Sequence, residues 1–369
     1  MKNLRSITFV CALAIALLSP LAAFGQTATP TPKVADDEII KVDSRLIVIP
    51  VSITNANGDP ILGLTAADFR VTEENRSQTI DAVSGADKVP LEIALLFDVS
   101  ASTDTMFKFE LETAAKFLRD VMRPEDRATI FSIGAKPILV QPRDTADRTA
   151  TAIQNIRPTK EFTAFYDTVA AAADYLKMNA PEGSRKVILV ISDGEDTHSL
   201  RITKAINDGY RKINVNKIDS KVLYELTVKN RNEAGIAERK RILKLLQDVD
   251  SVFYSINPAG SSLQLNKMSL AGQEGMQKFA VDTGGTAFLP KFQPFDTKDD
   301  LQNISNTRKN AEILDRIFRQ LGNELRSQYL VQYYSDADFP VGQFVNLNLG
   351  LANRPELKIR ARQGYFVKN

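Results

Sequence analysis

The sequence has little of the two residue types that most often build zinc sites and hydrolase triads. Among 369 residues there is a single cysteine, Cys11, and a single histidine, His198. Zinc sites made of Cys and His are therefore excluded, and a Ser-His-Asp hydrolase would have to use His198. Strong net charge is missing too. The formal charge is +2, from 47 basic and 45 acidic residues, which gives no global argument for binding nucleic acid or a membrane surface.

The chain does have enough apolar sequence for more than one core, because 43% of its residues are hydrophobic. Residues 1–25 combine a positively charged start, an apolar run at 7–18 and a small-residue pattern ending at Gly25. This pattern predicts a signal peptide cleaved after Gly25, and hence a secreted or periplasmic protein. A retained membrane anchor is the alternative, but Ser19-Pro20 breaks the run, which is short for a span. Cleavage would remove Cys11, so no disulfide is expected.

Two stretches of β character flank the middle of the chain. Residues 26–37 are rich in Thr, Pro and Ala and predict a flexible leader. Residues 38–88 and 327–369 contain short alternating runs separated by turn signals. Neither stretch is large enough to bury a core alone, so we expect them to pair into one small β-sandwich-like domain.

Between them, residues 89–326 alternate strands with helices. The most apolar strands are predicted at 91–97 and 186–192. Such alternation predicts an α/β domain with a Rossmann-like, doubly wound, mostly parallel sheet. The predicted helices are 107–122, 146–156, 164–178, 236–246, 273–282 and 311–325.

Oxygen-bearing side chains follow the first of these strands directly. The sequence LEIALLFDVSAS ends in Asp98, Ser100 and Ser102. A strand that stops there places its oxygens at the carboxyl edge of the sheet, where open α/β folds bind ligands. Oxygen ligands without nitrogen or sulfur suit Mg²⁺, Mn²⁺ or Ca²⁺. The alternative is a loop whose Asp and Ser residues cap the following helix.

Two later segments carry the same kind of side chain. Thr163 lies where a loop turns into the helix at 164–178, and Asp193 follows the strand KVILVIS, with Gly194 allowing a sharp turn. Each could be a further metal ligand. Each also has a structural interpretation, Thr163 as a helix N-cap and Asp193 as part of an ordinary Asp-Gly turn.

In this order, DxSxS, a threonine opening a helix and a strand ending in SDGE resemble the von Willebrand factor type A family with its metal-ion-dependent adhesion site. The flanking segments ILGLTAADFRV, SQYLVQYY and IRARQGYF resemble a bacterial secreted subfamily of unknown biochemical role. The resemblance implies that Asp98, Ser100, Ser102, Thr163 and Asp193 hold Mg²⁺, or else Mn²⁺ or Ca²⁺.

The same resemblance implies a binding protein rather than an enzyme. In the family, the ion accepts an Asp or Glu carboxylate from a partner protein or surface ligand. A structural ion with water as its last ligand is one alternative. A serine hydrolase using Ser100 or Ser102 with His198 is another, but no G-x-S-x-G elbow is present and the metal needs those hydroxyls.

A basic insert interrupts the domain at about 199–235. Residues 201–244 carry many Lys and Arg against few acids, and residues 222–228 alternate like a strand. The insert is either a solvated excursion or a basic rim, including Lys212 and Lys217, that steers acidic partners toward the metal.

Overall fold

The computed structural model describes residues 44–100, 104–159, 161–213, 218–258, 267–294 and 297–368. The predicted signal peptide and leader, together with Ser102 and Lys217, lie outside these residues. In the described ranges, no helix is both long and apolar enough to span a bilayer.

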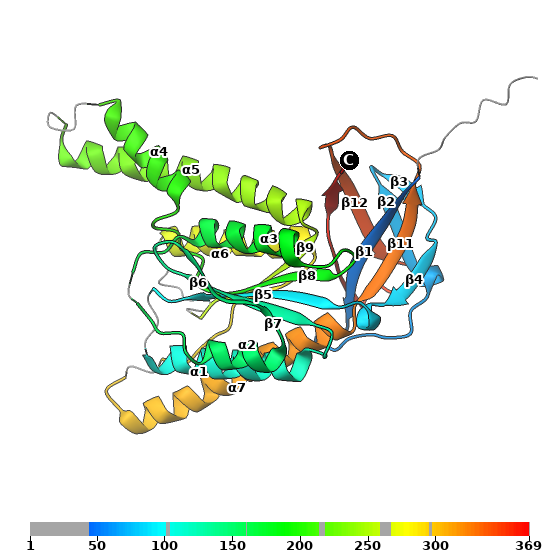
Figure 1. Cartoon of the computed structure of the whole chain (residues 1–369), viewed down its shortest axis with the longest axis horizontal. Helices are drawn as coiled ribbons and strands as arrows, with labels where there is room; N and C mark the ends of the chain where they lie inside the picture. The colour runs from blue at the N-terminus through cyan, green and yellow to red at the C-terminus, as the bar shows by residue number, and fades with distance from the viewer. Residues whose placement is uncertain are drawn as a thin grey trace, which may run out of the picture. The chain divides into compact units, whose positions relative to one another are not determined.

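A six-stranded sheet forms the centre of the α/β region, in the order β10-β9-β8-β5-β6-β7 (Figure 1). Five strands run parallel, and β7 pairs antiparallel with β6. The continuous apolar runs of β5 and β8 are buried because helices cover both faces of the sheet. The fold class predicted from the sequence is therefore confirmed. The strands are β5 (Leu91–Asp98), β6 (Arg127–Ile133), β7 (Pro137–Asp144), β8 (Arg185–Ile191), β9 (Ser251–Ile256) and β10 (Ala287–Phe288).

Two hydrophobic cores lie on the two faces of this sheet. Alternate residues of β5 face alternate cores, Ile93 and Leu95 toward one and Ala94 and Leu96 toward the other. The first core packs against α1 (Asp104–Val121), α2 (Ala146–Ile153) and α7 (Asp300–Arg326). The second packs against α3 (Phe165–Asn179), α5 (Ser220–Asp248) and α6 (Lys267–Thr283).

The basic insert is helical, which corrects one prediction. Residues 222–228 were expected to form a strand, but they lie inside α5, a helix of 29 residues. It packs against α4 (Leu200–Arg211) as a two-helix hairpin (Figure 1). The Tyr210 hydroxyl lies 2.6 Å from the Thr227 hydroxyl. Alternation over seven residues was misleading: Leu223, Leu226 and Thr227, at helical spacing, are half-buried, whereas Val222 and Tyr224 are exposed.

The segments before and after the α/β region pair with one another. The sheet β13-β1-β11-β4 contains two strands from each end of the chain, and so does the sheet β14-β12-β2-β3. Their facing side chains form a third core, which includes Ile49, Phe69 and Tyr333. The strands are β1 (Arg45–Thr54), β2 (Phe69–Glu73), β3 (Arg76–Gln78), β4 (Ala82–Gly85), β11 (Tyr329–Ser335), β12 (Phe344–Leu351), β13 (Lys358–Ala361) and β14 (Gly364–Phe366), with single 3₁₀ turns at Ala66–Asp68 and Ala86–Lys88.

Candidate functional site

Asp98 is the last residue of β5, in the middle of the sheet's carboxyl edge. Both of its carboxylate oxygens accept hydrogen bonds. Oδ1 accepts from the backbone N–H and the hydroxyl of Ser100, at 3.0 and 2.6 Å. Oδ2 accepts from the Ser192 hydroxyl at 2.7 Å. The carboxylate is therefore held in place by the turn that follows β5 and by the neighbouring strand end.

The turn after β8 places Asp193 beside this carboxylate. The Gly194 N–H donates to the Ser192 hydroxyl at 3.0 Å, and the Glu195 N–H donates to Asp193 Oδ1 at 2.9 Å. Ser192 thus links the ends of β5 and β8. Sequence reasoning did not assign Ser192 a role, although its place just before Asp193 was a usable signal.

Thr163 does not act as the N-cap of the following helix. The N-cap of α3 is Ala164. The N–H of Tyr166, in the first turn of the helix, donates to the Asp196 carboxylate at 3.0 Å. Thr163 is buried, and its N–H and C=O are fixed by Thr197. In the part of the chain that the structure describes, the Thr163 hydroxyl has no hydrogen-bond partner.

The three segments converge on the carboxyl edge. The Val99 N–H donates to the carbonyl of Ile133 at the end of β6, and the Ala164 N–H donates to the next carbonyl, that of Gly134. The Thr197 N–H, just after the β8 turn, donates to the Thr163 carbonyl at 2.9 Å. Four of the five predicted ligands, Asp98, Ser100, Thr163 and Asp193, therefore sit on linked turns, and the fifth, Ser102, lies outside the described residues.

A further buried carboxylate, Glu110 of α1, interacts with this site. Its Oε1 is buried without a hydrogen-bond partner among the described residues. Burial, followed by the negative charge of Asp98, raises the pKa of Glu110 to about 8. The sequence signal was its spacing, since Glu110 lies four and seven residues before Ala114 and Phe117 on the apolar face of the helix.

The site has a surplus of negative charge. Burial raises the pKa of Asp98, and burial with the charges of Asp98 and Glu195 raises the pKa of Asp193 to about 6. Among the described residues, no Lys or Arg forms an ion pair with Asp98, Asp193 or Glu110. Buried carboxylates without a cation are unfavourable, and a divalent cation relieves that cost. The described residues hold no group of three or more His, Cys, Asp or Glu arranged for a metal, so the hydroxyls would be essential ligands.

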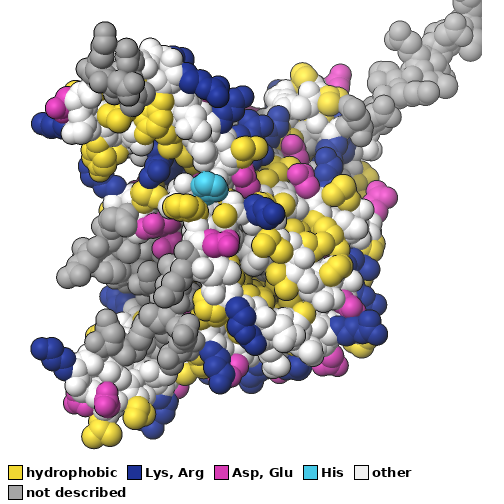
Figure 2. All heavy atoms as spheres, turned by 60° about the vertical axis from the view of Figure 1, so that its left-hand side comes forward, with side chains coloured by type: hydrophobic (Ala, Val, Ile, Leu, Met, Phe, Trp, Pro, Cys, Tyr) yellow, Lys and Arg dark blue, Asp and Glu magenta, His cyan; other side chains and the backbone are white. Residues whose placement is uncertain are grey.

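An exposed aromatic pair lies beside these turns. Phe162 is 64% exposed and stacks on the His198 ring, with centroids 5.2 Å apart and planes 13° apart. Figure 2 shows the histidine, in cyan, on the surface among hydrophobic side chains. The Ser100 hydroxyl is bonded to Asp98 while His198 stacks on Phe162, an arrangement unlike a Ser-His pair.

Part of the α/β region matches a known protein family. Residues 93–195 match the sequence profile of the von Willebrand factor type A domain, a range that includes Asp98, Ser100, Thr163 and Asp193. The chain contains a von Willebrand factor type A domain. No match was found among curated protein sequences.

Solved structures resemble this domain only distantly. Proximal thread matrix protein 1 from the mussel byssus is 9% identical, with a TM-score of 0.38 over 65% of this chain and 50% of its own. The vWF domain of the type V pili tip protein Mfa5 from Porphyromonas gingivalis is 12% identical, with a TM-score of 0.40 over 63% of this chain and 95% of its own. The PilB minor pilin from Streptococcus sanguinis is 12% identical, with a TM-score of 0.38 over 64% of this chain and 62% of its own. The chain thus spans half the length of the mussel protein, and these likenesses carry no argument about function.

Of the predicted basic rim, Lys212 is exposed at the end of α4, and Lys217 lies outside the described residues. The type A domain's insert therefore presents Lys212 at the tip of a helical hairpin. Its role in steering acidic partners stays a prediction.

The Asp193 turn depends on a close approach between two backbones. Gly194 has a φ of +78°, and a Cβ there would lie 2.9 Å from the backbone of Gly272 on α6. We expect Gly194→Ala to lower the free energy of unfolding by about 2–3 kcal/mol, because it adds left-handed strain and a clash. Urea unfolding measures this.

Gly183→Ala is the matched control. Gly183 has a φ of +75°, but a Cβ there would meet nothing within 4 Å. It should lose only the strain contribution, about 1 kcal/mol. Equal losses in the two variants would show that the contact with Gly272 does not hold the turn.

Proposed function

We propose that this protein binds a partner protein or surface ligand through a divalent cation held at the carboxyl edge of its type A domain. One observation carries the proposal. Thr163 is buried on a turn linked to two half-buried carboxylates, Asp98 and Asp193. Among the described residues its hydroxyl is unbonded and the carboxylates have no Lys or Arg counter-ion. The match to the type A domain supports a protein-interaction module.

The residues that would hold the ion are Asp98, Ser100, Thr163 and Asp193, with Ser102 as the fifth predicted ligand. Two aspartates and neutral hydroxyls fit an oxygen-binding cation such as Mg²⁺ or Mn²⁺. When bound, the ion supplies a positive centre that attracts a carboxylate from outside. Two aspartate charges would balance the two charges of the ion and the hydroxyls add none, so a partner Asp or Glu would be accepted through an open coordination position.

The protein's own residues orient this site. Ser192 and Ser100 fix both oxygens of Asp98, and Thr197 fixes the backbone of Thr163. The exposed Phe162–His198 pair offers an apolar surface next to the ion site on which a partner can pack. The predicted signal peptide would deliver the module beyond the membrane, where such partners are found.

Bound Mn²⁺ provides a direct test of an open coordination position. We expect Mn²⁺ with the wild-type protein to enhance water-proton relaxation, because bound water exchanges at the open position. Adding glutarate, as a mimic of an acidic side chain, should then reduce the enhancement. Asp174→Ala, an exposed carboxylate of α3, should behave as wild type.

If Mn²⁺ binds at these residues but glutarate leaves the relaxation unchanged, the ion is a structural element and the partner-binding proposal fails. If Asp98→Ala and the wild type give the same enhancement, the ion binds elsewhere.

Ion binding should also depend on pH. A carboxylate must lose its proton to bind a metal, and burial raises the pKa of Asp193 to about 6. Mg²⁺ affinity should therefore fall below its value at pH 7, by roughly tenfold per pH unit well below pH 6 for each proton displaced. Calorimetric titration at pH 5, 6, 7 and 8 measures this, and equal affinity at pH 5 and pH 7 would contradict it.

A further inference from the structure

The Phe162–His198 pair is carried by the two turns that hold Thr163. Phe162 directly precedes Thr163, so their Cα atoms are about 3.8 Å apart. His198 directly follows Thr197, and the N–H groups of both Thr197 and His198 donate to the Thr163 carbonyl at 2.9 Å. The pair is therefore fixed at the rim of the proposed ion site by the same hydrogen bonds that fix one of its ligands.

The two rings form an exposed surface and not part of a core. Phe162 is 64% exposed, and His198 is exposed as well (Figure 2). Phe162 belongs to none of the three hydrophobic cores that the described residues form. Leu200, two residues beyond His198, is 71% exposed at the start of α4. Exposed apolar side chains gathered beside a binding site are typical of an interaction surface.

Stacking prepares this surface for binding. Because the Phe162 ring already lies on the His198 ring, little side-chain freedom remains to be lost when a partner packs on it. Aromatic side chains placed in this way carry a large share of the binding energy at many interfaces.

The acidic side chains around the pair are mostly engaged within the protein. Asp196 and Asp167 accept hydrogen bonds from backbone N–H groups in the first turns of α3 and α4, at 3.0 and 2.8 Å. Glu195 accepts one from the Ser269 hydroxyl. Glu161, which lies before the pair in sequence, is exposed. The surface of the pair therefore favours an apolar side chain of the partner, and a cationic side chain attracted by Glu161 is the competing outcome.

An extended partner segment determines which of its residues meets the pair. Successive side chains of an extended chain point to opposite sides, whereas side chains two residues apart point the same way, about 6–7 Å from one another. When the acid of the partner points at the ion, the side chain two residues away therefore also points at this protein. The side chain next to the acid points away from it.

We infer that the Phe162–His198 pair selects partner segments that carry an apolar side chain, such as leucine, two residues from the acid that meets the ion. This inference rests on the proposed function and adds a sequence preference to it. The pair itself holds no ion.

Calorimetry on Mn²⁺-loaded wild-type protein tests the preference with symmetric pentapeptides blocked at both ends, so that chain direction does not matter. Leu-Gly-Glu-Gly-Leu should bind about 5-fold to 10-fold more tightly than Ala-Gly-Glu-Gly-Ala, because one leucine buries about half of its side chain on the pair. Lys-Gly-Glu-Gly-Lys should not exceed the leucine peptide. Leu-Gly-Gln-Gly-Leu, which lacks the acid, should bind much more weakly than the leucine peptide.

The outcomes separate this inference from the proposed function. If the leucine and alanine peptides bind equally, or the lysine peptide binds most tightly, the apolar preference is wrong while capture of the acid by the ion stands. If none of the glutamate peptides binds to protein that holds Mn²⁺, the proposed function fails and this inference fails with it.

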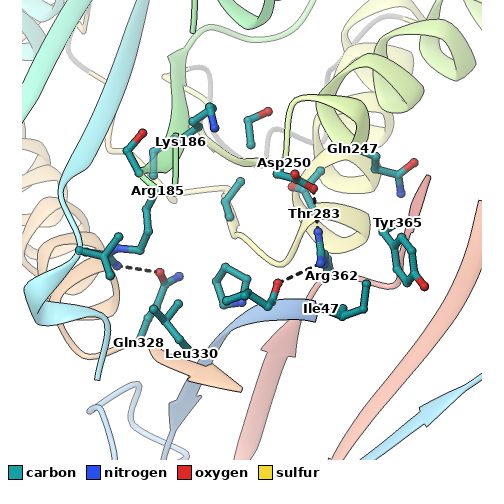
Figure 3. A pocket seen from close by; sticks show the side chains of 18 of the residues that line it. Ile47, Arg185, Lys186, Gln247, Asp250, Thr283, Gln328, Leu330, Arg362 and Tyr365 are labelled. Carbon is teal, nitrogen blue, oxygen red and sulfur yellow. Dashed lines mark hydrogen bonds and ion pairs between the residues drawn. The ribbon is translucent and has the colours of Figure 1, made fainter. Parts of the chain in front are cut away.

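A cationic cavity elsewhere requires its own control. At the amino edge of the sheet, where β8 and β9 begin, a cavity of about 530 Å³ is lined by several cationic side chains, among them Lys186 and Arg362 (Figure 3). Repeating the titrations with a chelator removes the ion and leaves this cavity intact. A leucine preference that persists without the ion would place the apolar contact away from the ion site and overturn the inference.

Substitutions at Phe162 locate the contact through the ratio of the leucine-peptide affinity to the alanine-peptide affinity. Phe162→Ala should bring this ratio close to 1, and Phe162→Tyr, which keeps the ring, should retain it. Met178→Ala removes a 75% exposed side chain near the end of α3 and, as the matched control, should keep the wild-type ratio. A wild-type ratio in Phe162→Ala would overturn the inference.

The histidine gives a direct readout without substitution. Because His198 is the single histidine of the chain, its imidazole resonances need no assignment. In Mg²⁺-loaded protein, the leucine peptide should show nuclear Overhauser effects between its methyl groups and the imidazole protons. A leucine preference without these effects, and with unchanged imidazole resonances, would place the contact on another surface and contradict the inference.

Discussion

Asp98→Ala is expected to weaken Mg²⁺ binding by about 100-fold or more while the domain stays folded. The change removes one of the two ligand charges and the acceptor that orients Ser100 and Ser192. Folding should tolerate it, because burial already raises the pKa of Asp98 and makes its charged form unfavourable in the ion-free protein. Calorimetric titration with Mg²⁺ measures the affinity, and circular dichroism monitors the fold.

Two further variants serve as comparisons for Asp98→Ala. Thr163→Ala removes a neutral ligand and should weaken the ion less than Asp98→Ala. Asp174→Ala removes an exposed carboxylate of α3 and should leave the affinity unchanged. Equal affinity in the wild type and in a folded Asp98→Ala variant would place the ion elsewhere.

Glu110 is expected to make the ion-free protein markedly less stable at alkaline pH. Its pKa is about 8 in the folded state against 4.5 as an ordinary carboxyl, because burial and the charge of Asp98 oppose ionisation. The folded state therefore holds a proton that the unfolded state has released between these values. The contribution of Glu110 to the free energy of unfolding is constant below pH 4.5 and falls as pH rises toward 8. At 1.36 kcal/mol per pKa unit, the free energy of unfolding falls by about 4–5 kcal/mol over this range.

Comparison with Glu110→Gln isolates this effect, since glutamine keeps the shape and does not titrate. In the presence of a chelator, urea unfolding from pH 4 to 9 should show the wild type losing stability relative to Glu110→Gln across that window. Glu112→Gln, whose side chain is 57% exposed, is the control and should follow the wild type. Parallel curves for the wild type and Glu110→Gln would refute the assignment.

The sequence predicted the features that depend on local pattern. The apolar runs of β5 and β8 are unambiguous, and polar residues immediately after them must lie at the carboxyl edge of a parallel sheet. That reasoning placed Asp98, Ser100 and Asp193 at this edge, and the resemblance to the type A family added Thr163. It also led us to expect that the terminal β segments pair, because neither could bury a core alone.

What the sequence could not predict depends on contacts between distant segments. The Ser192 hydroxyl reaches Asp98 because β8 pairs with β5, and the sequences of the two strands do not reveal this strand order. The buried Arg185 side chain donates from Nη1 to the Leu325 carbonyl and to Gln328 Oε1, contacts that the sequence around β8 does not reveal. Residues 222–228 were assigned to a strand because a short apolar alternation does not reveal the hairpin partner α4.

The most direct test of the ion-mediated binding proposal is anomalous diffraction at the manganese edge from crystals soaked in Mn²⁺ and glutarate. The account predicts a peak bounded by Ser100, Thr163 and the carboxylates of Asp98 and Asp193, with an oxygen of glutarate completing the coordination. A strong manganese peak elsewhere with none at these residues, or a peak here whose ligands exclude glutarate, would contradict it.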